Sequence, residues 1–329
     1  MGKQSSLNGS RLYCPVNKSS DGVLFNLADY RNSRFTSENP DKIIEFYDSF
    51  KNMHDLVEWM EERPKGAVNI HEVDGDKEII VVIPTADFNG KYAKECKNNI
   101  FKGLYIIFVE SGGRGDFYFN YAHNCNVGIK KAMEYNPKWI VCSNDDMIKW
   151  DDVDVLISSL SKINSKDFDF VLTKPSEYHS IKAFIGKPRT LYWQVLALLG
   201  RSYKELAKVR KNFCGLNYSA ITHRSLFTKL FFKEMKTFTN LGDFFIVSPY
   251  YLKKRQRELL DSTYLNIMED VELSLEMDFN VKIMTIEYLI KDLIGSSLGN
   301  GLIRSFRSTA GIAYFNYKVK HGIIRLDIP

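Results

Sequence analysis

A pair of neighbouring acidic residues gives the clearest chemical signal in this chain of 329 residues. Asp145 and Asp146 follow Asn144, directly after the apolar run 139–142. Adjacent carboxylates repel one another, and a bound cation removes that repulsion. Proteins usually hold Mg²⁺ with one or two carboxylates, while phosphate and water supply its other ligands. We therefore predict that residues 144–146 bind a divalent cation together with a phosphate group.

A second acidic pair, Glu269 and Asp270, opens a segment with helical character at 269–275. Carboxylates at a helix N-terminus interact favourably with the helix dipole, so simple capping is one interpretation. The other interpretation is a general base, since a carboxylate beside an acceptor hydroxyl can take its proton as a bond forms. The residues alone leave both interpretations open.

Two common nucleotide-binding motifs do not occur in the sequence. There is no Gly-x-Gly-x-x-Gly and no Gly-x-x-x-x-Gly-Lys-Ser/Thr, so dinucleotide-binding and P-loop assignments have little support. A Gly-x-Ser-x-Gly occurs at 295–299, but it follows none of the expected strands, so an α/β-hydrolase assignment has little support as well. The six histidines form no closely spaced metal-binding pair.

Composition points to a globular protein of a reducing compartment. The apolar fraction is 44% and the charged fraction 26%, and the net charge of +5 is too small to indicate nucleic acid as a partner. The five cysteines are scattered, which indicates neither a disulfide framework nor a zinc site. No signal peptide or membrane-spanning run is recognised, so we expect a cytoplasmic protein.

The expected strands and helices alternate along the central part of the chain. Apolar runs typical of strands buried on both faces occur at 79–83, 104–109, 139–142 and 168–173. Helices are expected between them at 92–100, 118–135 and 151–163. This order predicts an α/β fold with a doubly wound, mostly parallel sheet.

Polar residues follow three of these strands. Pro84 and Thr85 end the first, Glu110 ends the second, and residues 144–146 follow the third. Ligands of such sheets bind at the carboxyl ends of the strands. We therefore expect these residues to lie at one edge of the sheet.

Two flanking regions surround the expected catalytic domain at 78–295. The N-terminal extension 1–77 is expected to contain loops to about residue 38 and one amphipathic helix at 41–62. That helix leaves self-association as a homo-oligomer open. The C-terminal tail 296–329 is expected to pack on the catalytic domain.

The segment 182–211 combines basic residues with the apolar run 191–199. One interpretation is a helix with one face in the core and solvated lysines on the other. A mobile acceptor loop is a second, and a surface that touches anionic lipid at the inner face of a membrane is a third.

Five segments in order carry a resemblance to a known family: residues 81–85, 110–112, 126–132, 144–146 and 269–274. Together they resemble glycosyltransferase family 2, whose members have the A-type nucleotide-sugar transferase fold, a Rossmann-like doubly wound sheet. The resemblance covers about residues 78–290. It implies an inverting, metal-dependent glycosyltransferase that uses Mn²⁺ or Mg²⁺. The donor would be a nucleoside-diphosphate sugar, with UDP favoured, and the acceptor a hydroxyl of a glycan or lipid-linked glycan.

The resemblance also implies roles on the donor side. Pro84 and Thr85 would line the base pocket, and Glu110 would contact the base or ribose. Asp146 would bind the metal, with Asp145 near the sugar or ribose. Two asparagines complete the implied donor-binding set, Asn126 in the third matching segment and Asn144 in place of the first acid of the Asp-x-Asp motif.

On the acceptor side, the resemblance implies that Asp270 is the general base and that Glu269 orients the acceptor or sugar. A metal-binding histidine found late in some relatives has no obvious counterpart. Asp292 or Ser296 would replace it, or the site would use Asp146 and the diphosphate alone.

Two other functions remain open from the sequence. A nucleotidyltransferase of sugar phosphates shares the sheet and the metal-binding acids, but the loop 86–92 is poorer in glycine than such enzymes require. A non-catalytic scaffold with the same fold is the other.

Overall fold

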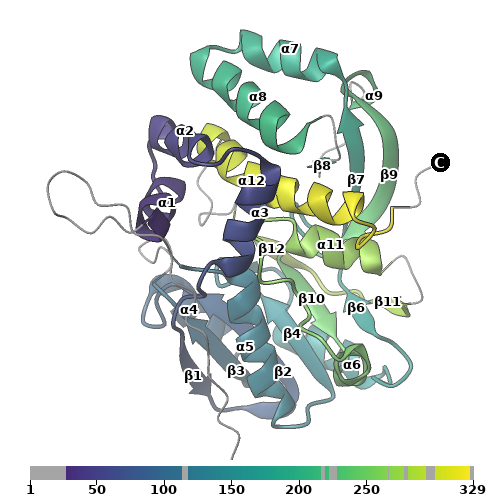
Figure 1. Cartoon of the computed structure of the whole chain (residues 1–329). Coiled ribbons are helices and arrows are strands. Elements are labelled where there is room, and N and C mark those ends of the chain that lie inside the picture. Colours follow the sequence, from purple (N-terminus) through teal and green to yellow (C-terminus); the bar gives the residue numbers. More distant parts are fainter. Residues whose placement is uncertain are drawn as a thin grey trace, which may run out of the picture.

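In a computed structural model of the chain, a mixed seven-stranded sheet lies at the centre, with helices on both faces (Figure 1). The structure describes residues 27–112, 118–215, 219–221, 228–265, 267–277, 281–293 and 301–326. The strands, in their order across the sheet, are β1 (Asn69–Val73), β3 (Leu104–Glu110), β2 (Asp76–Thr85), β4 (Trp139–Ser143), β10 (Phe244–Val247), β6 (Phe170–Leu172) and β11 (Ile283–Thr285).

Strand direction makes this sheet mostly parallel. β2, β3, β4, β6 and β11 run in one direction, while β1 and β10 run against them. The predicted α/β class and the mostly parallel sheet are therefore confirmed, and β2, β3, β4 and β6 match the four predicted strands. β10 was not predicted from the sequence. β1 precedes residue 78, where the catalytic domain was expected to begin.

Alternate residues of β2 pack into opposite apolar layers. Ile79, Val81 and Ile83 lie in one layer, and Ile80 and Val82 in the other. Successive side chains of a strand point to opposite faces, so a strand covered on both sides must be apolar throughout. The first layer holds α4 (Lys91–Glu95), the π-helix η1 (Cys96–Ile100) and α6 (Val153–Ser161); the second holds α5 (Tyr121–Met133), α10 (Pro249–Arg255) and α11 (Glu269–Glu276).

A second, largely helical part of the molecule has its own core. α12, the yellow helix of Figure 1, packs against α8, α3 and α2, so segments from both ends of the described chain meet there. A separate three-stranded sheet in the order β8, β7, β9 joins this part. The elements are α1 (Leu27–Phe35), α2 (Pro40–Asp48), α3 (Met53–Glu62), β7 (Ile181–Pro188), α7 (Thr190–Leu198), α8 (Arg201–Cys214), β8 (Ser219–Ile221), α9 (Thr228–Phe231), β9 (Phe232–Asn240) and α12 (Gly301–Lys320).

Two predictions for the N-terminal extension were wrong. Helix α1 occupies part of the region expected to be loop, and the single helix expected at 41–62 is two helices, α2 and α3. The side chain of Asn52 accepts hydrogen bonds from the amides of His54 and Asp55, at 2.8 and 3.2 Å, and so begins a new helix. The apolar spacing hides this break, because residues of both helices, such as Phe46 and Trp59, pack into the same core.

The segment 182–211 forms most of β7 together with α7 and α8, which favours the helical interpretation over a mobile loop. Within the described residues, no helix combines the length and the apolar character needed to cross a bilayer. The cysteines of the described residues are buried free thiols: Cys96, Cys125, Cys142 and Cys214.

Candidate functional site

Asp145 and Asp146 lie at the carboxyl end of β4, beside the end of β2. The hydroxyl of Thr85 donates a hydrogen bond of 2.6 Å to Oδ2 of Asp145. Burial raises the pKa of Asp145, and the bond from Thr85 acts in the opposite direction. The structure thus brings together two residues that the sequence placed at the ends of separate strands.

Asp243 is a third carboxylate at this edge, and sequence reasoning missed it. β10 runs antiparallel to β4, with Phe244 opposite Ser143, so the residue before β10 lies beside the residue after β4. Burial raises the pKa of Asp243 well above its ordinary value, and the carboxylates of Asp292, Asp270 and Asp146 raise it further. These four carboxylates therefore repel one another across a single site.

Asp292 joins the cluster because β12 (Ile290–Asp292) pairs with β5 (Met147–Lys149), directly after Asp146. The amide of Leu293 donates a hydrogen bond of 2.8 Å to the carbonyl oxygen of Asp146. Burial, followed by the charges of Asp145 and Asp292, raises the pKa of Asp146 to about 6. Of the two residues considered in place of a late histidine, Asp292 is thus beside Asp146, while Ser296 lies outside the described residues.

A histidine supports the position of Asp292. Oδ2 of Asp292 accepts a hydrogen bond of 2.7 Å from the hydroxyl of Ser176 and lies 3.0 Å from Nδ1 of the buried His179. Oδ1 of Asp292 has no hydrogen-bond partner within the part of the chain that the structure describes. The aspartate is therefore held from one side and keeps a free oxygen.

Glu269 and Asp270 form the N-terminus of α11, as predicted, and both lie within electrostatic reach of Asp243. Burial raises the pKa of Asp270, while a hydrogen bond from Asn240 and the charge of Arg304 lower it. Met268, just before the helix, has a left-handed backbone with φ of 79°.

The acidic cluster supplies part of a donor set for a divalent cation. Among the described residues, no group of three or more His, Cys, Asp or Glu side chains has the arrangement of a complete metal site. Asp146 and the free Oδ1 of Asp292 supply carboxylate oxygens, and the unpartnered buried Oδ1 of Asn144 supplies an amide oxygen. This donor set suits a hard cation that takes its remaining ligands from phosphate and water.

Two of the predicted donor-binding residues are engaged in other contacts. Glu110 accepts a hydrogen bond of 2.9 Å from the amide of Phe88 and lies 2.8 Å from Nε2 of His71. These bonds lower the pKa of Glu110, and the ring of His71 stacks on Phe88 at 4.2 Å. Glu110 thus fixes the loop that follows β2.

Asn126 is bound to the segment that precedes α11. Its side-chain amide donates to the carbonyl oxygen of Leu260 at 2.7 Å, and its oxygen accepts from the amide of Leu260 at 3.2 Å. We therefore assign Asn126 a structural role. Pro84 is buried within β2, next to Thr85.

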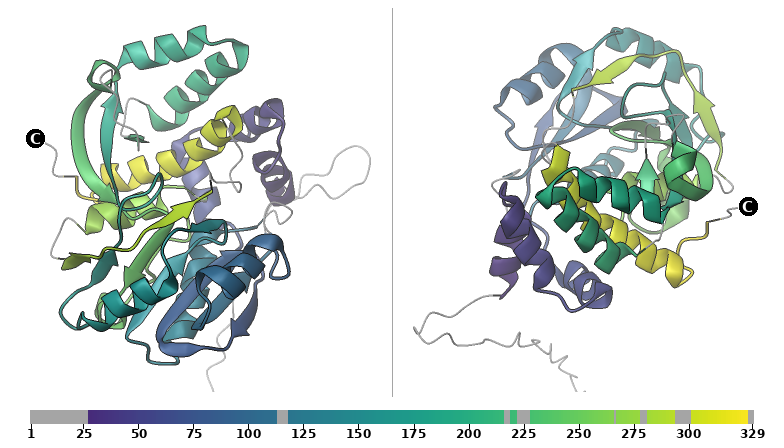
Figure 2. Two further views of the ribbon diagram at one scale, coloured as in Figure 1. Left: turned by 180° about the vertical axis from the view of Figure 1, so that it is seen from behind. Right: turned by 90° about the horizontal axis from the view of Figure 1, so that it is seen from above.

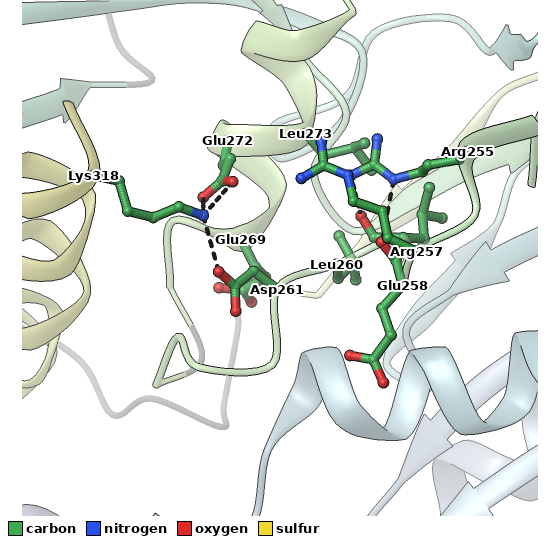
Figure 3. Close-up of a pocket in the computed structure, with 10 residues that line it drawn as sticks. Arg255, Arg257, Glu258, Leu260, Asp261, Glu269, Glu272, Leu273 and Lys318 are labelled. Atoms are coloured by element: carbon green, nitrogen blue, oxygen red, sulfur yellow. Dashed lines mark hydrogen bonds and ion pairs between the residues drawn. The ribbon is translucent and has the colours of Figure 1, made fainter. Parts of the chain in front are cut away.

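A pocket of about 160 Å³ lies beside α11, and Glu269 lines it (Figure 3). Oε2 of Glu269 has no partner among the described residues, and burial, followed by the charge of Asp270, raises its pKa well above the usual range. The other residues that line the pocket are mostly charged: Arg255, Arg257, Glu258, Leu259, Leu260, Asp261, Glu272, Leu273 and Lys318.

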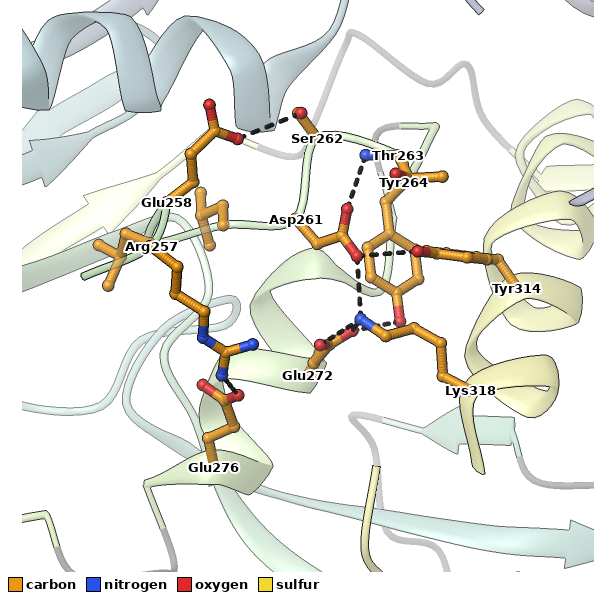
Figure 4. Close-up of polar contacts among 12 residues, drawn as sticks. Arg257, Glu258, Asp261, Ser262, Thr263, Tyr264, Glu272, Glu276, Tyr314 and Lys318 are labelled. Carbon is orange, nitrogen blue, oxygen red and sulfur yellow. Dashed lines mark hydrogen bonds and ion pairs between the residues drawn. The ribbon is translucent and has the colours of Figure 1, made fainter. Parts of the chain in front are cut away.

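A buried lysine connects this pocket to α12. Nζ of Lys318 lies 2.9 Å from Asp261 and 2.7 Å from Oε2 of Glu272, and the hydroxyls of Tyr264 and Tyr314 complete the network (Figure 4). Since Glu272 belongs to α11, Lys318 ties the helix that carries Asp270 to the tail of the chain.

No protein-family model matches the chain, and no curated protein or solved structure is similar enough to count as a match.

Proposed function

We propose that the protein is an inverting, metal-dependent glycosyltransferase that moves a sugar from a nucleoside-diphosphate sugar to a hydroxyl group. The observation that supports this most is the meeting of Asp146, Asp292 and Asp270 around Asp243 at one end of the sheet. An acid pair for a cation and a separate carboxylate for a proton are what such a transfer requires. The central sheet is compatible with the Rossmann-like, nucleotide-diphospho-sugar transferase type of fold.

Asp146 and Asp292 are the residues that would hold a Mn²⁺ or Mg²⁺ ion, with Asn144 beside them. When bound, the cation offsets the negative charge that develops on the departing diphosphate. Thr85 orients Asp145, which is thereby positioned for a hydroxyl of the donor ribose or sugar. Pro84, Thr85 and the loop fixed by Glu110 form the side of the site where the base, with UDP favoured, binds.

Asp270 acts as the general base in this proposal. It takes the proton of the acceptor hydroxyl while that oxygen forms a bond to the anomeric carbon, and the bond from that carbon to the diphosphate breaks. Attack from the face opposite the diphosphate inverts the configuration. Burial raises the pKa of Asp270, which makes its carboxylate a stronger base than an exposed aspartate.

The pocket beside Glu269 is the proposed entrance for the acceptor. Its charged lining suits a hydroxyl-rich molecule, so we propose a glycan or the glycan part of a lipid-linked acceptor. Burial and the charge of Asp270 raise the pKa of Glu269, which favours its protonated form, and a protonated carboxyl can donate a hydrogen bond to a sugar hydroxyl.

The test is donor turnover. Release of nucleoside diphosphate is measured from UDP-, dTDP- and GDP-sugars with Mn²⁺ and a panel of glycan acceptors. We expect one donor to turn over and Asp270→Asn to lower its rate about 10²- to 10⁴-fold while donor binding remains. Asp154→Asn, an exposed acid on α6, is the control. Release of pyrophosphate from a nucleoside triphosphate with a sugar phosphate would instead identify a nucleotidyltransferase, and donor binding without turnover would indicate a scaffold.

A further inference from the structure

Helix α7 exposes an apolar face at the outer end of the molecule, on the far side of α8 from α12 (Figure 1; seen from above in Figure 2). Leu198 is 85% exposed and Leu199, directly after the helix, is 62% exposed. Leu191 and Val195 are also exposed, and the spacing of these residues places them on one side of the helix. We call the four residues the leucine face.

The leucine face is not needed to hold α7 in place. Trp193, on the opposite side of the helix, is buried, and the ring of Tyr192 lies 5.3 Å from that of Phe232. α7 also packs along α8. The exposed apolar side chains are therefore additional to the packing that holds α7 against α8.

The surroundings of the leucine face are positively charged. The exposed side of α8 carries Arg201, Lys204, Lys208 and Lys211. Between residues 187 and 215 the only acid is Glu205, whose carboxylate lies 3.7 Å from Nζ of Lys208. α7 itself contains no charged residue. Close by in the fold, α9 exposes Leu230 next to Lys229 and contacts α7.

We propose that the α7–α8 hairpin docks the protein on an anionic lipid surface, with the leucine face inserted among the acyl chains and the cations of α8 paired with lipid phosphates. Such a membrane is apolar inside and negatively charged at its surface. Exposed leucines match its apolar interior, and the neighbouring basic side chains match its charged surface. This inference does not depend on the proposed function and applies whatever reaction the protein catalyses.

Sedimentation with lipid vesicles tests the proposal. The full-length protein is mixed with vesicles of phosphatidylcholine alone, or with about one-third phosphatidylglycerol added. One variant combines Leu198→Glu with Leu199→Glu, and a second combines Arg201→Glu with Lys204→Glu. Ile323→Glu is the matched control, because Ile323 is 60% exposed but lies after α12, outside the hairpin. Thermal unfolding shows that each variant is folded.

We expect the wild-type protein to bind the anionic vesicles only, and added salt to weaken this binding. Each double variant should bind about tenfold or more weakly. The control should bind like wild type. Failure of wild type to bind anionic vesicles, or equal binding by the leucine variant, overturns the proposal. Light scattering without lipid tests the alternative that the leucine face binds a second copy of the chain. If wild type is a dimer, the leucine variant is a monomer and neither binds vesicles, the face is a dimer interface.

Discussion

The backbone amide of Asn144 donates a hydrogen bond of 3.1 Å to the carbonyl oxygen of Asp243. This bond continues the antiparallel pairing of β4 with β10 past the last paired residues. It therefore places Asp243 beside the Asp145–Asp146 pair, although about 100 residues separate them in the sequence. The acidic cluster depends on this contact between two strand ends.

Asp146→Asn should stabilise the metal-free protein. The pKa of Asp146 is raised to about 6, so the folded state favours its protonated form. Stability from this group is complete below the ordinary aspartate pKa and is lost as the pH rises through about 6. At about pH 8 the variant should gain about 1 to 3 kcal/mol in free energy of unfolding, and at about pH 4 almost nothing.

Urea unfolding with a chelator present measures this gain. Asp154→Asn, at an exposed position, should change stability little at either pH. A loss of stability in Asp146→Asn at the higher pH would contradict the description of the cluster as a set of mutually repelling carboxylates.

Thr85→Val should weaken nucleotide binding while the fold is kept. Valine has the shape of threonine but cannot donate the 2.6 Å hydrogen bond to Asp145. Since that bond lowers the pKa of Asp145, its loss leaves the carboxylate less ionised and unoriented. We expect about tenfold weaker binding by calorimetry, since a hydrogen bond to a charged group contributes about 1.5 to 3 kcal/mol. Thr85→Ser keeps the donor and should bind normally; equal weakening in both variants would argue against the role of this bond.

Gly242→Ala should destabilise the protein by displacing the loop that contains His179. Gly242 precedes Asp243 and has φ of 63°, and a Cβ there would lie 1.6 Å from the carbonyl oxygen of Tyr178. The alanine would push away the loop whose Ser176 and His179 hold Asp292. Gly322→Ala is a matched control, because φ is 70° but nothing lies within 4 Å. We expect Gly242→Ala to cost at least about 2 kcal/mol more in unfolding free energy than the control. Similar costs would show that backbone strain alone matters.

Lys318→Met should destabilise the protein strongly. Lys318 is buried against Glu272 and Asp261, and removing the lysine leaves these carboxylates without their cation. Breaking a buried ion pair from one side costs about 3 to 5 kcal/mol. Lys320→Met, two residues on in the same helix and exposed, should be nearly neutral in urea unfolding. If the two variants unfold alike, the network of Figure 4 does not hold α12 to α11.

The sequence predicted the parts of the fold that have local signals. β2, β3 and β4 are continuous apolar runs, and each is followed by polar residues, so both the strands and the position of Asp145 and Asp146 were predictable. β10 is also a short apolar run, at 244–247, but nothing local shows that it pairs between β4 and β6 and against their direction. Asp243 was missed for that reason.

Other features of the site depend on side-chain contacts that a sequence does not specify. Asn126 lies in a segment that resembles the family, yet its amide bonds to Leu260, more than 130 residues away. The support of Asp292 by His179 arises from the pairing of β12 with β5 and from the close approach at Gly242. The break between α2 and α3 was hidden because both helices face one core.

The most direct test of the central claim is calorimetric binding of UDP, dTDP and GDP, each with and without Mn²⁺. Wild type is compared with Asp146→Ala and with the exposed control Asp154→Ala. The account predicts that one nucleotide, UDP by preference, binds only with the metal, that Asp146→Ala abolishes this binding, and that the control retains it. Binding of none of the three nucleotides by the folded wild-type protein, or undiminished metal-dependent binding by Asp146→Ala, would contradict it.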